Sequence, residues 1–271
     1  MISYKNLLKL TQKKHRREQG LCIVEGEKIV RELAPIAVQV FVRGGTGGSA
    51  PYTVLSEKEL KAVSDLETNQ GILAVVPIPK PREVTFPYLV LDGIQDPGNM
   101  GTLLRTAAAF GFNTVFCLDC VDVWSQKVLR AGVGTQFKLN IWETNFEGFK
   151  TQLSKLKNNK LFVADVTTPP PSEAPLVGSA DAVANKFGEL VADCKSQPGS
   201  WNKVHNSPPW RGGHAERGRG GLVLGNEGNG VSAQIKSLPH EVVTIPMNDG
   251  VESLNVAVAG GILMYELGGR K

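Results

Sequence analysis

Beyond residue 85, short apolar runs alternate with longer amphipathic stretches. The stretches predict helices near 98–110, 125–132, 145–157, 230–237 and 253–267. The runs predict strands at Tyr88–Asp92, Asn113–Leu118, Lys138–Trp142, Lys160–Ala164, Gly221–Leu224 and Glu241–Ile245. Strands that alternate with helices favour a parallel sheet with helices on both faces, and ligands of such sheets bind outside the carboxyl ends of the strands.

The first 80 residues show a different, shorter pattern. It predicts a basic helix over 3–19, a helix over 25–33, strands at Val38–Val42 and Gly71–Val76, and a helix from Ser56 to Val63 with a capping box completed by Glu59. The proline-rich run 77–81 predicts a stiff, extended linker. We therefore predict a small α/β domain over 1–80 and a second domain over 85–271.

The region 167–220 interrupts the alternation of strands and helices. It is rich in proline and glycine and has no clear periodicity, so we interpret it as a partly disordered insertion. Its end, 211–221, resembles an RGG-type RNA-binding tract, although a flexible solvated loop is the favoured interpretation.

The composition narrows the class of protein. Of 271 residues, 41% are apolar and 21% charged, which is typical of a folded chain and not of a disordered one. No apolar run is long enough for a membrane span, so we expect no membrane partner. Residues 1–31 hold eight lysines and arginines against three glutamates, a net charge of +5, whereas the whole chain carries +4. This cluster suits a phosphate backbone, with a solvated helix face as the alternative. Because glutamate is unusual in transit peptides, we expect the start to belong to the mature protein.

The cysteines and histidines predict no metal site. Cys117 and Cys120 form a CxxC pair, but a zinc site needs a second pair of ligands, and Cys22, Cys194 and the four histidines supply none at typical spacing. A redox CxxC normally opens a helix, whereas this pair closes a predicted strand. We therefore interpret both as cysteines in or near a core strand.

Three segments carry candidate chemistry. In Asp96–Ala107, Asn99 is a plausible helix N-cap and Arg105 a group that orients a phosphate or hydroxyl. In Leu222–Ser232, a strand enters a glycine-rich turn in which Glu227 contacts a ligand or braces the structure. In Val243–Gly261, Ser253 is a candidate cap for a helix of small residues. Taken singly, each segment is equally compatible with a structural role.

Together, in this order, the segments resemble the SpoU (TrmH-like) family of S-adenosylmethionine-dependent RNA 2′-O-ribose methyltransferases, of the SPOUT class. The resemblance covers about 85–167 and 220–267. The segments 25–28 and 68–74 resemble the family's substrate-binding domain, an L30e/L7Ae-like α/β module.

The resemblance implies a C-terminal SPOUT domain with a deep trefoil knot, a rare exception to unknotted topology. It implies S-adenosylmethionine as cofactor, RNA as substrate with rRNA favoured over tRNA, and a homodimer. The implied catalytic residues are Arg105, Asn99, Ser253, Asn255 and Glu227. The implied cofactor-binding residues are Gly225, Asn226, Glu227, Gly230, Ile245, Pro246, Met247, Leu254 and Asn255.

Two other functions stay open at this stage. One is a catalytically silent RNA-binding protein of the same fold. The other is a nicotinamide oxidoreductase, against which the lack of a glycine-rich strand-to-helix turn argues. The compartment also stays open, because cytoplasm, mitochondria and plastids all contain suitable RNA.

Overall fold

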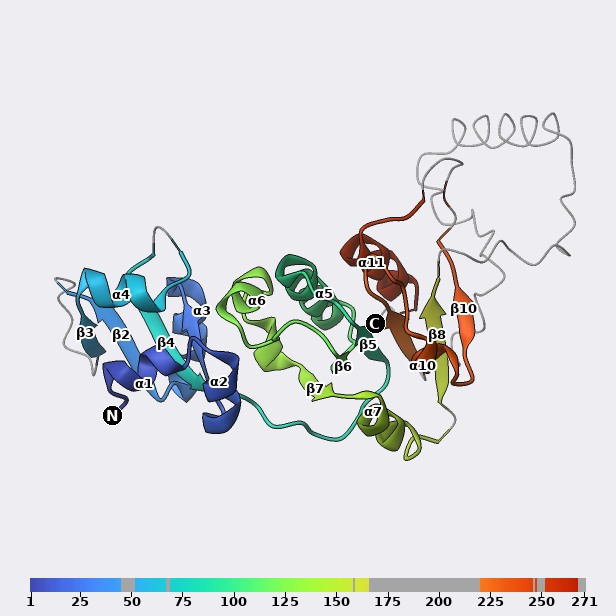
Figure 1. Cartoon of the computed structure of the whole chain (residues 1–271), viewed down its shortest axis with the longest axis horizontal. Helices are drawn as coiled ribbons and strands as arrows, with labels where there is room; N and C mark the ends of the chain where they lie inside the picture. The colour runs from blue at the N-terminus through green and yellow to red at the C-terminus, as the bar shows by residue number, and fades with distance from the viewer. Residues whose placement is uncertain are drawn as a thin grey trace, which may run out of the picture. The chain divides into compact units, whose positions relative to one another are not determined.

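The computed structural model describes residues 1–44, 52–66, 69–157, 159–165, 220–245, 247 and 252–267. They form a four-stranded sheet with the order β1-β4-β2-β3 and a six-stranded sheet with the order β10-β8-β9-β5-β6-β7 (Figure 1). Apart from Gly220, the predicted insertion at 167–220 lies outside the described residues.

The first sheet belongs to an N-terminal α/β module. Its strand β2 pairs parallel with β3 and antiparallel with β4, which also pairs antiparallel with β1. Phe41 and Leu73 pack with α1 and α4 on one face, and α3 packs with the other. The elements are α1 (Tyr4–Lys9), α2 (Lys13–Gln19), β1 (Leu21–Glu25), α3 (Glu27–Leu33), the 3-10 turn η1 (Ala34–Ile36), β2 (Gln39–Arg43), β3 (Tyr52–Leu55), α4 (Glu57–Val63) and β4 (Ile72–Pro77).

Two predictions for this module are wrong. The helix over 3–19 is two helices, since α1 ends at Lys9 and α2 begins only at Lys13. The predicted helix over 25–33 starts at Glu27, because 21–25 form the unpredicted strand β1. Gly20 separates β1 from α2 by adopting φ +63°, a left-handed conformation that ends the helix.

The capping box at α4 is confirmed. The Ser56 hydroxyl accepts a hydrogen bond from the backbone N–H of Glu59, and Glu59 Oε2 accepts one from the backbone N–H of Ser56 at 2.9 Å. The Ser56 backbone N–H and the Ser56 hydroxyl both donate to Glu59 Oε2, and these two hydrogen bonds lower the pKa of the Glu59 carboxyl. Ser56 and Glu59 thus satisfy two backbone donors that the helix itself cannot.

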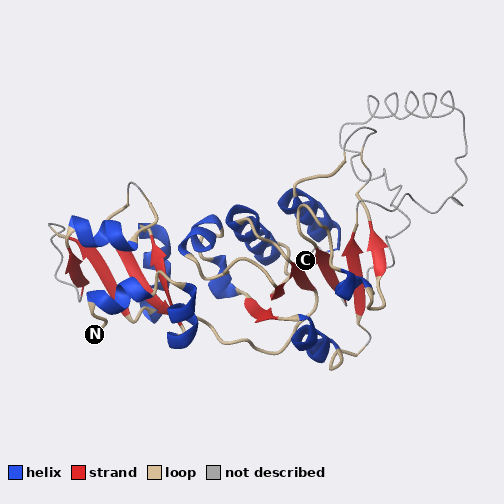
Figure 2. Ribbon diagram, in the orientation of Figure 1, coloured by secondary structure: helices blue, strands red, loops and turns tan. Residues whose placement is uncertain are grey.

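The second sheet is parallel throughout, as predicted. Helices α5, α6 and α11 cover one face, and α7 and α10 cover the other (Figure 2). The elements are β5 (Tyr88–Asp92), α5 (Pro97–Ala109), β6 (Thr114–Leu118), α6 (Gln126–Ala131), the 3-10 turn η2 (Thr135–Lys138), β7 (Asn140–Thr144), α7 (Phe146–Leu153), β8 (Lys160–Ala164), β9 (Gly220–Leu224), α10 (Ala233–Lys236), β10 (Glu241–Val243) and α11 (Val256–Leu267).

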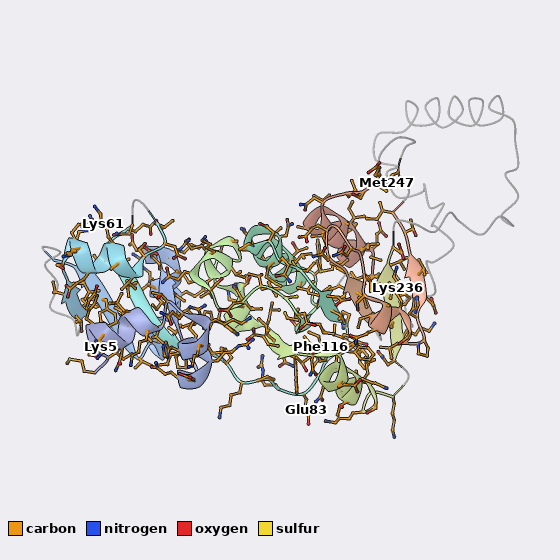
Figure 3. The ribbon with its side chains drawn as sticks, in the orientation of Figure 1. Lys5, Lys61, Glu83, Phe116, Lys236 and Met247 are labelled. Carbon is orange, nitrogen blue, oxygen red and sulfur yellow. The ribbon has the colours of Figure 1, made fainter. Side chains whose placement is uncertain are left out.

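Most strand predictions for this sheet hold to within two residues. The strand predicted at Lys138–Trp142 begins at Asn140, since η2 occupies 135–138, and the one predicted at Glu241–Ile245 ends at Val243. The helices α7, α10 and α11 are shorter than predicted. Phe116 of β6 is fully buried between strand and helix layers (Figure 3).

Glycines let α5 pack closely against two neighbours. A Cβ on Gly101 would lie 2.4 Å from Ala131 Cβ of α6. A Cβ on Gly260 of α11 would lie 2.5 Å from Leu103 Cδ2 of α5. The small residues predicted for the last helix therefore serve close packing, and α5, which carries Asn99 and Arg105, is held from both sides.

Polar contacts join the N-terminal module to the second sheet. The buried guanidinium of Arg16 in α2 pairs with the Asp122 carboxylate in the loop after β6. Gln126 Nε2 donates to the Val63 carbonyl at 2.9 Å. A buried ion pair costs desolvation unless its geometry is good, and here the Arg16 guanidinium also donates to the Leu10 carbonyl at 2.7 Å. Within the described residues, no helix has the length and apolar character needed to cross a membrane.

Candidate functional site

The three candidate segments meet at the carboxyl ends of neighbouring strands. Strand β5 ends at Asp92 and leads into α5, while β9, paired beside β5, ends at Leu224 and leads into the glycine-rich turn. The start of α11 comes to the same edge, because Asn255 contacts Asn99 of α5. This is the edge at which ligands of parallel α/β sheets bind.

A chain of side-chain hydrogen bonds connects all three segments. Asn255 Nδ2 donates to Asn99 Oδ1 at 3.0 Å, and Asn99 Nδ2 donates to Glu227 Oε1 at 2.8 Å. Because a carboxylate only accepts hydrogen bonds, Glu227 fixes which way the Asn99 amide faces. Residues 128 and 156 positions away from Asn99 thus converge on one side chain.

The glycine-rich turn is closed on itself. The backbones of Asn226 and Gly230 exchange two hydrogen bonds, and Asn226 Oδ1 accepts from the backbone N–H groups of Gly228 and Asn229. A Cβ on Gly225 would lie 2.2 Å from the Gly230 carbonyl carbon, and Gly230 itself adopts φ +67°. Both positions therefore require glycine.

The end of β5 holds this turn through two hydrogen bonds, and one of them involves Asp92, which was not among the predicted site residues. Asn226 Nδ2 donates to the Gly93 carbonyl at 2.8 Å. The buried Asp92 carboxylate accepts from the backbone N–H of Ser232 at 2.7 Å. A charged residue that directly follows the apolar run 88–91 was the signal available in the sequence.

Two predicted helix caps are wrong. Asp96, not Asn99, is the N-cap of α5, since Asp96 Oδ1 accepts from the Asn99 backbone N–H at 2.7 Å. Likewise α11 begins only at Val256, and Asn255 Oδ1, not Ser253, accepts from the Ala257 N–H at 2.9 Å. Asn99 thus lies within one turn of the residue that caps α5, and Asn255 itself caps α11.

Arg105 is on α5 but outside the hydrogen-bond chain. It lies six residues beyond Asn99, which is about 9 Å along the helix and roughly 120° around it. Its side chain is exposed to solvent. Arg105 and Asn99 therefore do not share one face of α5.

The remaining predicted site residues differ in their exposure to solvent. Ile245, Leu254 and Met247 are half-buried, and Ser253 is exposed (Met247 is labelled in Figure 3). Pro246 lies outside the described residues. The described segments bring together no group of three or more histidine, cysteine, aspartate or glutamate side chains that could hold a metal ion.

The fold and the site define a two-module α/β protein with a polar site beside a closed glycine turn. Residues 87–265 match the SpoU rRNA Methylase family, and residues 3–74 match the MRM3-like substrate binding domain. The chain belongs to the SpoU rRNA Methylase family.

Curated relatives cover both modules. The chain is 32% identical to mouse rRNA methyltransferase 3, mitochondrial, over 93% of its length and 68% of the relative's. It is 28% identical to the Bacillus subtilis 23S rRNA (guanosine(2553)-2′-O)-methyltransferase RlmP, over 98% of this chain and 95% of RlmP. It is 32% identical to zebrafish rRNA methyltransferase 3B, mitochondrial, over 77% of this chain but only 54% of that protein, so it spans about half the length of some relatives.

A solved structure shares the fold over nearly the whole chain. A putative RNA methyltransferase of the TrmH family from Porphyromonas gingivalis superposes with a TM-score of 0.69 at 28% identity, covering 98% of both chains. The parallel sheet and the N-terminal substrate-binding module are therefore those of the SpoU/TrmH methyltransferases.

Proposed function

We propose that this protein transfers a methyl group from S-adenosylmethionine to a ribose 2′-hydroxyl of RNA, with ribosomal RNA as substrate. The observation that carries the proposal is the hydrogen-bond chain Asn255–Asn99–Glu227, which joins all three candidate segments at the carboxyl edge of the sheet. Membership of the SpoU rRNA Methylase family supports the reaction class. The names of the B. subtilis and mouse relatives support rRNA over tRNA.

The residues around the glycine turn fit the proposed cofactor. Half-buried Ile245, Met247 and Leu254 offer apolar surface, and the turn at 225–230 offers backbone groups without obstructing side chains at its glycines. We assign cofactor binding to this set together with Asn226, Glu227, Asn255 and Pro246. When bound, the cofactor's sulfonium supplies an electrophilic methyl group.

The protein's own task is to position and polarise the acceptor hydroxyl. Arginine stays protonated in proteins, so Arg105 acts as a hydrogen-bond donor to the 2′-oxygen or to an adjacent phosphate. Asn99, held by Glu227 and Asn255, presents a fixed amide at the carboxyl edge of the sheet. Ser253, which is exposed and precedes Asn255 by two residues, completes the proposed catalytic set.

The N-terminal module offers a surface for the RNA backbone. Helices α1 and α2 carry exposed Lys5, Lys9, Lys13, Lys14 and Arg17, and Glu18 is the only acidic residue among the first 19. The Arg16–Asp122 ion pair fixes α2 against the loop after β6. We propose that this module, over about 1–80, binds the substrate RNA and presents it to the domain over 85–271.

A homodimer with a knotted C-terminal domain completes the proposal. Along α11, Val258, Ile262 and Tyr265 are exposed at spacings of four and three residues, so they form one apolar stripe. Such a stripe suits burial against a second subunit. The knot is inferred from the family resemblance, with the turn at 225–230 and the segment 243–255 as its crossing loops. The protein would act wherever its rRNA lies, in cytoplasm or organelle.

The test is methyl transfer from labelled S-adenosylmethionine to rRNA, followed by mapping of the label to sugar or base. Arg105→Ala should lower the transfer rate about 100-fold or more, because it removes a donor used at the reacting oxygen. Cofactor affinity, measured by calorimetry, should stay within a factor of two or so of wild type, since Arg105 lies outside the proposed cofactor set.

Other outcomes have defined meanings. Near wild-type transfer by Arg105→Ala would refute the role assigned to Arg105. Transfer to tRNA but not rRNA would correct the substrate. Cofactor binding with no transfer to either RNA would favour the silent RNA-binding protein.

A further inference from the structure

Two thiols that are not part of the proposed catalytic set lie at the carboxyl end of β6 and in the loop that follows it. Cys117, the fourth residue of β6, is 3% exposed, and Cys120 is half-buried. Asp119 between them adopts φ +49°, a left-handed conformation that turns the chain at the end of the strand. Both cysteines line the same cleft of about 360 Å³ at the carboxyl ends of β6 and β7.

The two thiols are neighbours that line the same cleft. A hydrogen bond with the Cys120 thiol, together with burial, raises the pKa of the Cys117 thiol well above its ordinary value. The Cys120 Sγ also lies 3.2 Å from the carbonyl oxygens of Leu91 and Leu118, which keep it at the end of the sheet. Cys22, by contrast, is a fully buried thiol whose nearest hydrogen-bond acceptor is the Val76 carbonyl.

The cleft gives Cys120 access to solvent and places charged groups around it. Lys13 and Arg17 of α2 line it from one side, and Asp119 and Glu143 from the other. Arg17 pairs with Glu143 at 3.2 Å, so this pair is largely self-neutralised. Lys13 is a further cation that lines this cleft.

We propose that Cys117 and Cys120 are a redox-active thiol pair, which hydrogen peroxide oxidises to an intramolecular disulfide. Cys120 is the thiol that the oxidant reaches, and Cys117 is the buried partner that resolves the product. A metal-binding role would need further ligands, and the described part of the chain brings none to the pair.

The proposed chemistry balances in two steps. The Cys120 thiolate attacks one peroxide oxygen, the O–O bond breaks, and a sulfenic acid and one water form once the leaving hydroxide is protonated. The Cys117 sulfur then attacks the sulfenic sulfur, the S–S bond forms, the S–O bond breaks, and a second water leaves. In total, two thiols lose two electrons and two protons, and the peroxide is reduced to water.

The test uses the reduced full-length chain treated with hydrogen peroxide, unfolded in the presence of an alkylating reagent, and digested with trypsin. Both cysteines appear in one peptide, 106–127, because no lysine or arginine lies between Arg105 and Lys127. We expect this peptide to lose two hydrogen atoms in mass and both alkylation sites, and to regain the two sites after reduction. The Cys22 peptide should remain fully alkylated under the same conditions.

Two variants separate the roles of the thiols. Cys117→Ala, which leaves no new buried hydroxyl, should accumulate a sulfenic acid at Cys120 that dimedone traps. Cys120→Ser should leave Cys117 as an unmodified thiol. The proposal is overturned if peptide 106–127 stays a dithiol, if Cys120 in the wild-type chain proceeds to sulfinic acid, or if either cysteine pairs with Cys194 instead.

Discussion

At the scale of the residue, the orientation of one amide organises the proposed catalytic site. Asn99 donates to Glu227 and accepts from Asn255, so both ends of its side chain are committed. A carboxylate at position 99 would face the Glu227 carboxylate across the same short distance. Two carboxylates so close cannot both be ionised without cost.

We therefore predict that Asn99→Asp lowers methyl transfer roughly ten- to hundred-fold at neutral pH. Lowering the pH should restore part of the activity, because repulsion raises the pKa of one carboxyl and its protonation restores a donor. The measurement is a pH profile of transfer. Asn229→Asp, the same change on an exposed residue of the neighbouring turn, should match wild type at every pH. Equal losses in both variants would contradict the assigned role of Asn99.

The closed shape of the glycine turn depends on the absence of a side chain at Gly225. Gly225→Ala would bring a methyl group to within 2.2 Å of the Gly230 backbone, so the turn must open. We expect the affinity for S-adenosylmethionine to fall at least about ten-fold, as for a lost contact worth some 1.4 kcal/mol. Calorimetric titration measures this directly.

Gly228→Ala is the matched control for that experiment. A Cβ at 228 meets only the Asn226 side-chain oxygen, at 3.6 Å. Its cofactor affinity should equal that of wild type, and a similar loss in both variants would show that the closed shape of the turn is not what matters.

At the scale of the element, α2 both contacts the second sheet and carries exposed cations. Its inner residue Arg16 anchors it through Asp122, while its outer residues Lys13, Lys14 and Arg17 face solvent. Lys14 lies 4.0 Å from Glu18, and Arg17 pairs with Glu143, which partly offsets their charge. Lys5, Lys9 and Lys13 have no acidic side chain within ion-pair distance among the described residues, so they are the cations best suited to phosphate.

We predict that Lys9→Glu combined with Lys13→Glu weakens rRNA binding and reduces the slope of log affinity against log salt by roughly two. The measurement is a filter-binding titration at several salt concentrations. Lys61→Glu on α4 changes charge in the same module, and Figure 3 shows Lys61 and Lys5 at opposite edges of it. An equal effect of Lys61→Glu would mean that net charge, and not this surface, governs binding.

At the scale of the whole molecule, the apolar stripe on α11 is exposed to solvent in the single chain. Val258 and Ile262 are 53% and 41% exposed although the helix buries its other apolar side against α5 and β9. Tyr265 at the end of the stripe packs edge-on against Phe110, the C-cap residue of α5. This ring contact joins the end of α11 to the end of α5, the helix that carries Arg105.

We predict that Ile262→Glu converts the proposed dimer to a monomer in sedimentation equilibrium, because it would place a charge in an apolar interface. Val54→Glu on β3, which is 63% exposed in the N-terminal module, is the control and should stay dimeric. A wild-type chain that sediments as a monomer would refute the proposed dimer itself.

The sequence by itself determined the local elements and the order of the candidate segments. Runs that are apolar at every position, such as 88–91 and 221–224, predict strands covered on both faces, as in a parallel sheet, and the structure buries β5 and β9 throughout. The capping box at Ser56 was likewise predictable, since both partners lie within four residues of each other. Caps at Asp96 and Asn255 were not, because several neighbouring polar side chains compete for the same backbone donors.

Only the tertiary structure decided which candidate residues meet. Asn99, Glu227 and Asn255 converge because β9 pairs beside β5 and α11 packs against α5, contacts that join segments more than a hundred residues apart. Asp92 became visible as a brace of the glycine turn for the same reason. The local pattern of a sequence shows the periodicity within one segment. Strand order and helix packing bring distant segments together, and the proposed chemistry of this protein depends on those tertiary contacts.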